Sequence, residues 1–106
     1  MFAELEEKII SRELWHNQDI SRDDLAALVG INRRQLDDIL KMRLPEGETW
    51  QTWLEGFRFH EALGMILESK APGSVASACG YASEKALDRS FRKNTGLSLR
   101  EFMEGM

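Results

Sequence analysis

Basic side chains gather in one short stretch of this chain, although its 106 residues carry a formal net charge of −4. The stretch GYASEKALDRSFRKNTGLS, residues 80–98, holds Lys85, Arg89, Arg92 and Lys93, with no acid between Arg89 and Lys93. Ammonium and guanidinium groups bind phosphate, and the arginine fork also matches the acceptors of guanine. The chemistry that these residues can perform is therefore the recognition of a polyanion.

The surrounding charge limits where such a surface can lie. Residues 1–60 carry eight Lys/Arg against twelve Asp/Glu, whereas residues 61–106 carry six of each. Net charge by itself argues mildly against a nucleic-acid ligand. A polyanion-binding surface must be local, and we expect it mainly in the second half.

The sequence contains few residues that could form a catalytic or metal-binding site. Cys79, His16 and His60 are the only cysteine and histidines, and their spacing matches no metal motif. Because no nucleophile–base pair or paired carboxylates appear, we expect no enzyme activity, no catalytic residues, no metal and no cofactor. The single cysteine fits a reducing cytoplasm, and no segment has the pattern of a signal peptide or a membrane span.

Helices must position the basic residues, because apolar side chains recur three and four positions apart along the whole chain. We predict an all-α fold of about seven helices, beginning with one near residues 2–16. A long helix should run from Thr49 to about Ser69, and Pro72 suits the first position of the next helix. The remaining predicted N-caps are Ser21, Asn32, Ser83 and Ser98, and the predicted helix stops are Gly30, Gly80 and Gly96.

The two halves of the chain repeat one pattern. Ala26, Gly30 and Ile31 match Ala76, Gly80 and Tyr81 at an offset of 50 residues. A small alanine lets a second helix cross closely, the glycine ends the first helix, and the apolar residue anchors the turn. This is the helix-turn-helix arrangement, which can set its second helix into a DNA major groove. Its occurrence twice at one period indicates a duplicated unit.

The segment ACGYASEKALDRSFRKNTGLSLREF resembles the signature of the AraC/XylS family of bacterial transcription regulators. The family pattern is Gly-Phe, then Phe-x-Arg-x-Phe-Lys, then Gly-x-Ser-Pro with an aromatic. The matching positions here are Gly80-Tyr81, Leu87 to Arg92, Gly96 to Leu99, and Phe102. The segment WLEGFRFHEAL is similar to the family's linker helix, with Arg58 and Ala62 in typical positions. The likeness covers about residues 19–103.

This resemblance implies a C-terminal-type DNA-binding domain with two helix-turn-helix units joined by a long helix. The implied recognition helices lie at about 32–42 and 83–94, in successive major grooves about 34 Å apart. The expected organisation is an N-terminal helix at 1–18, a first unit at 19–45, a linker helix at 49–69, and a second unit with a C-terminal helix at 71–104.

Several positions depart from the family pattern. Leu87 and Leu99 replace the usual Phe and Pro, Pro72 stands where an apolar residue normally packs, and the loop LPEGE is about two residues longer. The largest departure is Asp38, where the first unit usually carries an arginine and the second has Arg89.

In the second unit we expect Lys85 and Arg89 to reach base edges or phosphate, with Arg92 and Lys93 nearer the backbone. Glu84 and Asp88 either accept a hydrogen bond from cytosine N4 or hold the neighbouring cations in place. The alternative for Arg92 and Lys93 is a solvated helix end, where cations suit the dipole.

In the first unit Arg33, Arg34 and Gln35 occupy the N-terminus of the second helix, where side chains can enter the groove. Asp37 repels phosphates unless it binds a cytosine. We therefore expect the second unit to bind DNA more strongly than the first.

The function these features predict is sequence-specific binding of double-stranded DNA in transcription regulation. The resemblance implies contact with RNA polymerase, activation more often than repression, and a longer regulator that carries a sensor domain. A complete one-domain regulator is the alternative to such a fragment. A helical protein-interaction module that has lost DNA binding is the alternative function, favoured by the acidic net charge and by Asp37-Asp38.

Overall fold

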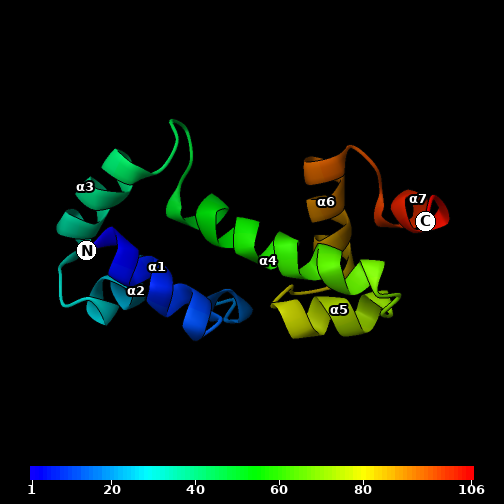
Figure 1. The fold of residues 1–106 in the computed structure, drawn as a ribbon, viewed down its shortest axis with the longest axis horizontal. Helices are drawn as coiled ribbons and strands as arrows, with labels where there is room; N and C mark the ends of the chain where they lie inside the picture. The colour runs from blue at the N-terminus through cyan, green and yellow to red at the C-terminus, as the bar shows by residue number, and fades with distance from the viewer. The chain divides into compact units, whose positions relative to one another are not determined.

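The computed structural model describes all 106 residues and contains seven α-helices, one short 3-10 helix and no strand (Figure 1). The predicted all-α fold of about seven helices is confirmed. The elements are α1 Phe2–Ser11, η1 Leu14–His16, α2 Arg22–Leu28, α3 Arg33–Arg43, α4 Trp50–Leu67, α5 Pro72–Cys79, α6 Glu84–Thr95 and α7 Leu99–Glu104. None of these helices combines the length and the apolar character needed to cross a bilayer.

The chain divides into two compact units, Met1–Gly56 and Phe57–Met106, and α4 contributes residues to both. The first unit contains α1, η1, α2, α3 and the start of α4. The second contains the rest of α4 with α5, α6 and α7. Each unit therefore holds one of the two repeated helix pairs.

Side-chain caps begin the helices at the predicted residues. The Ser21 hydroxyl accepts from the Asp24 N–H at 3.2 Å, and the Asp24 carboxylate accepts from the Ser21 N–H at 2.9 Å. The same reciprocal capping box joins Asn32 with Gln35, and Ser98 with Glu101. Two further hydroxyls, those of Thr49 and Ser83, accept from the backbone N–H three residues on. Each cap satisfies an N–H group that would otherwise lack an intrahelical partner.

Both helix-turn-helix turns close in the same way. Gly30 and Gly80 have φ angles of 69° and 88°, in the left-handed region that favours glycine. The following residue then donates its N–H back across the turn, Ile31 to the Ala26 carbonyl at 3.1 Å and Tyr81 to the Ala76 carbonyl at 2.9 Å. The repeat found in the sequence is therefore also a repeat of backbone hydrogen bonds.

The predicted first helix at 2–16 is wrong, because the helix ends early. The α1 helix stops at Ser11, Glu13 takes a left-handed conformation with φ 49°, and η1 follows. On a continuous helix Trp15 would point about 120° away from the face of Ile9, at 100° per residue. The break instead brings the Trp15 side chain into the core, where only 7% of it is exposed.

The first unit packs its core around residues from four helices. The side chains of Leu5, Ile9, Leu25 and Leu36 are almost completely buried. The start of α4 joins this core through Trp53, whose ring stacks on Phe2 with centroids 5.2 Å apart. The face of α3 that carries Leu36 is thereby turned inward, and the opposite face is left to solvent.

The second unit packs its core around Phe91 on α6, which is fully buried. The rings of Phe59 and Phe102 meet the Phe91 ring edge-on, with centroids 5.1 and 5.2 Å away. Helix α6 runs at a steep angle to α5 (Figure 1), and its Leu87 packs in the same core. Burial raises the pKa of the Cys79 thiol to about 12, so this side chain acts as a small hydrophobic residue.

Replacing Phe91 with alanine tests how far this core holds the second unit. We expect Phe91→Ala to lower the free energy of unfolding by about 3–5 kcal/mol, because a fully buried ring leaves a cavity. Urea denaturation followed by far-UV circular dichroism measures the change. Leu97→Ala is the control, since Leu97 is 43% exposed. A loss for Phe91→Ala no larger than that of the control would contradict this role.

Candidate nucleic-acid interface

Three cations form a row along the solvent face of α6. Lys85, Arg89 and Lys93 follow one another at four-residue spacing, and all three side chains are exposed. None of them takes part in an ion pair within the chain. Residues four apart share one helix face, so the three positive charges point to the same side. We call Lys85, Arg89 and Lys93 the cation row.

The buried side of α6 fixes the direction of this row. Leu87 and Phe91 are fully buried, and Ser90 between them is 6% exposed. The Ser90 hydroxyl lies 2.9 Å from the hydroxyl of Tyr81, the residue that anchors the turn after α5. Because apolar packing and this hydrogen bond hold one face inward, the opposite face has to project into solvent.

Asp88 binds two partners inside the second unit. Its Oδ1 accepts the Leu99 backbone N–H at 2.8 Å, and its Oδ2 accepts Arg92 Nε at 3.0 Å. These hydrogen bonds, first from Leu99 and then from Arg92, lower the pKa of Asp88 below its ordinary value. In the free chain Asp88 therefore holds a neighbouring cation and the start of α7, the second of the two roles expected for it. Because Arg92 is paired with Asp88, it is not counted in the cation row.

Glu84 leans toward the first turn of α5. A Cβ placed on Gly73 would come within 2.8 Å of the Glu84 Oε1 atom. Negative charge is favourable beside the N-terminus of a helix, where backbone N–H groups are unpaired. Glu84 and Lys85 both line an open groove of about 560 Å³, together with Leu99 and Met103 of α7.

Two ion pairs tie α2 to α3 in the first unit. Asp23 holds Arg33 through two bonds, with Nη2 to Oδ2 at 2.7 Å and Nε to Oδ1 at 2.9 Å. Asp37 holds Arg22 Nη1, at 3.1 Å from Oδ2 and 3.3 Å from Oδ1. The hydrogen bond from Arg33 lowers the pKa of Asp23 below its ordinary value. Sequence reasoning missed both α2 residues, because partners 10 and 15 positions apart follow no helical period.

The first unit therefore exposes fewer available cations than expected. Of the three residues at the start of α3, Arg33 is held by Asp23, and Gln35 uses its side-chain oxygen to accept the Asn32 N–H at 3.0 Å. Arg34 is exposed and makes no ion pair. Asp38 is exposed as well. The residues expected at this surface lie on one helix end, but only Arg34 is uncommitted.

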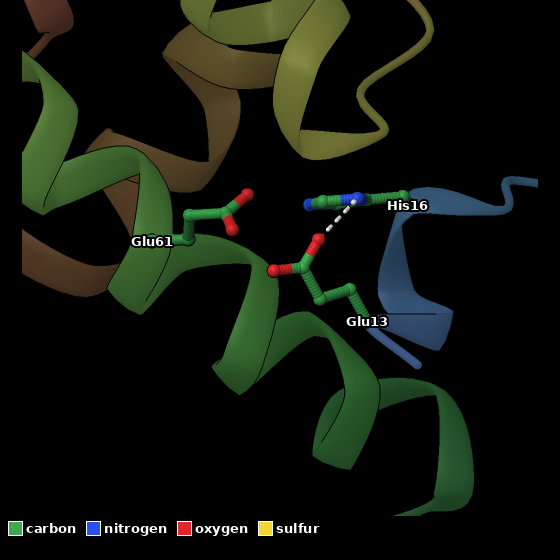
Figure 2. A group of neighbouring side chains, drawn as sticks. All are labelled: Glu13, His16 and Glu61. Atoms are coloured by element: carbon green, nitrogen blue, oxygen red, sulfur yellow. Dashed lines mark ion pairs between the residues drawn. The ribbon is translucent and has the colours of Figure 1, made fainter. Parts of the chain in front are cut away.

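The two histidines belong to η1 and α4 rather than to α3 or α6. His16 Nδ1 stands 3.4 Å from Glu13 Oε2, an ion pair when the imidazole is protonated (Figure 2). Glu61, the third side chain drawn there, belongs to α4 in the second unit. His60 is exposed on α4. His16 is half-buried.

The sequence matches the model of a helix-turn-helix domain family over residues 25–105, which is most of the chain. Among curated proteins no sequence matches. The fold is similar to that of the C-terminal domain of AraT, a response regulator from Geobacillus stearothermophilus. The TM-score is 0.80 at 17% identity, over 96% of this chain and 82% of that one.

Two further solved structures have a similar fold. An AraC-type DNA-binding protein from Chromobacterium violaceum has a TM-score of 0.77 at 24% identity, over 96% of this chain and 88% of that one. The DNA-binding domain of the global transcriptional factor AdpA, solved with a target DNA, has a TM-score of 0.79 at 25% identity, over 96% and 91% of the two chains. The chain belongs to the AraC-type helix-turn-helix DNA-binding domains.

Substitutions at Asp88 test its link between α6 and α7. Asp88→Ala removes both hydrogen bonds, whereas Asp88→Asn keeps an oxygen for the Leu99 N–H but loses the charge and the acceptor for Arg92. We expect Tm at pH 7 to fall in the order wild type, Asn, Ala, as measured by circular dichroism.

The pH dependence of the same variants follows from the lowered pKa. A carboxylate whose pKa is depressed by folding stabilises the protein above its ordinary pKa, and this contribution disappears as the pH falls through the folded value. The Tm difference between wild type and Asp88→Ala should therefore shrink below about pH 4. Asp38→Ala is the matched control, with an unchanged Tm. Equal Tm values for wild type and Asp88→Ala at pH 7 would refute the link.

Proposed function

We propose that this chain regulates transcription by binding double-stranded DNA sequence-specifically through α3 and α6, one in each of two successive major grooves. Membership of the AraC-type DNA-binding domains supports the class of ligand. The observation that carries the proposal is the cation row on α6, three exposed charges on one face with no acid paired to them.

The cation row supplies two kinds of contact in this proposal. Lys85 and Arg89 lie toward the N-terminal half of α6 and reach phosphate or base edges, with Arg89 suited to guanine O6 and N7. Lys93 lies one turn further on and binds the phosphate backbone. Arg92, which is held by Asp88, lies beside it as a second backbone contact. Phosphate contacts supply affinity and the base contacts supply discrimination.

The first unit contributes less of the electrostatic affinity. Arg34 is the uncommitted cation at the start of α3, and Arg33 contacts DNA only by leaving Asp23. Gln35 contacts bases in the same groove, and Asp37 reaches a cytosine only by releasing Arg22. The ranking of the two units that the sequence suggested is thus supported by the ion pairs of α2 and α3.

The wider role follows from the family rather than from this chain's own contacts. The proposed setting is the cytoplasm, with RNA polymerase as partner, activation as the sign of regulation, and a sensor domain elsewhere in the regulator. The fold likeness to a domain of a response regulator supports the last of these.

Salt dependence of DNA binding tests the proposal directly. The affinity of the chain for a random-sequence duplex should fall steeply with salt, because each phosphate contact releases counterions. Lys85→Ala/Arg89→Ala should reduce the slope of log K against log salt by about two, and Arg33→Ala/Arg34→Ala by about one. Fluorescence anisotropy with a labelled duplex measures both.

The control and the contrary outcomes are distinct. Lys70→Ala removes an exposed cation outside the recognition helices, and its slope should match that of wild type. Equal losses in the two double variants would contradict the ranking of the units. A wild-type slope near zero would instead favour the protein-interaction module.

A further inference from the structure

Ion pairs join the two helices of the helix-turn-helix in the first unit but not in the second. In the first unit α2 provides Arg22 and Asp23, and these pair with Asp37 and Arg33 on α3. In the second unit α5 has the sequence PGSVASAC, which contains no charged residue. The cation row on α6 therefore has no acid facing it from its partner helix. Ion pairs between the first and second helices of the repeat therefore occur in the first unit only.

The repeat shows that this difference lies at equivalent positions. At the offset of 50 that aligns the first helices, Asp23 corresponds to Gly73. At the offset of 51 that aligns the second helices, Arg33 corresponds to Glu84 and Arg34 to Lys85. Where the first unit places a carboxylate beside a recognition-helix cation, the second unit places a glycine.

The Arg33–Asp23 pair has a direct consequence for binding phosphate. To contact a phosphate, Arg33 has to exchange the two bonds of 2.9 and 2.7 Å for bonds to the DNA. The released Asp23 carboxylate then lies near a polyanion. Exposed ion pairs are weak enough to be exchanged, but like-charge proximity opposes the exchange on any duplex. Only a DNA sequence that offers well-placed base contacts offsets the free-energy cost of this exchange.

We propose that Asp23, together with Asp37, is a specificity-determining residue that keeps two cations of the first unit, Arg33 and Arg22, from binding DNA backbone indiscriminately. This inference rests on the proposed DNA-binding function and adds the residues that limit non-specific affinity. Asp23 acts through Arg33, and Asp37 acts through Arg22. Neutralising either acid converts a tethered arginine into a free phosphate-binding cation.

The test compares the full chain with Asp23→Asn, using a random-sequence duplex and a duplex selected by the wild-type chain from a random pool. We expect Asp23→Asn to bind the random duplex roughly fivefold more tightly at about 0.1 M salt, with a salt slope steeper by about one. The ratio of selected to random affinity should fall. Asp37→Asn, which releases Arg22, should move the random-duplex affinity in the same direction.

Two controls separate release of a cation from simple loss of negative charge. Asp19→Asn removes an exposed acid of the same unit that holds no cation, and its slope should stay that of wild type. Asp23→Asn/Arg33→Gln should lose the whole gain, because the released cation is gone. Circular dichroism confirms that each variant is folded.

The outcomes decide between the two proposals. An unchanged slope for Asp23→Asn, or a gain that persists in Asp23→Asn/Arg33→Gln, overturns the specificity role while DNA binding stands. Failure of the wild-type chain to bind either duplex overturns the proposed function and this inference together.

Discussion

Each helix-turn-helix depends on one backbone constraint, a left-handed glycine that ends the first helix. Gly30 and Gly80 meet it at φ angles of 69° and 88°, and the next N–H then bonds back to an alanine carbonyl five residues earlier. Once the turn is closed, the second helix has to cross the first at that small alanine. Its apolar stripe then faces the core, and the opposite stripe faces solvent whatever residues it carries. The exposed stripe is the part of each unit that can acquire a ligand.

The two exposed stripes differ in charge rather than in geometry. On α6 the cation row stands free, because α5 offers no acid and Asp88 is engaged by Leu99 and Arg92. On α3 the corresponding surface is tied back to α2 by Asp23 and by Arg22. The chain can therefore be acidic overall and still carry a polyanion-binding face, since affinity depends on which cations are uncommitted. Under the proposed function, the second unit supplies most of the electrostatic affinity and the first unit limits non-specific binding.

Local signals in the sequence predicted the helix boundaries well, with one exception. A capping hydroxyl or amide accepts from an N–H three residues away. The helix starts at Ser21, Asn32 and Ser98 can therefore be predicted from residues within a single turn. The exception is the end of α1. There the helix breaks at Glu13 and Trp15 is buried, and burial depends on tertiary packing rather than on a local sequence signal.

The sequence by itself determined the helices, the repeat and the membership of the AraC-type domains, because these rest on short-range hydrogen bonds and on periodic apolar contacts. It also determined that α6 would carry the densest basic face. Only the tertiary structure decided which cations are available, separating Arg92 from the cation row and pairing Arg33 with Asp23. Ion pairs between helices depend on the angle and register at which the helices cross. That geometry follows from the packed core as a whole, and the spacing of residues in the sequence does not predict it.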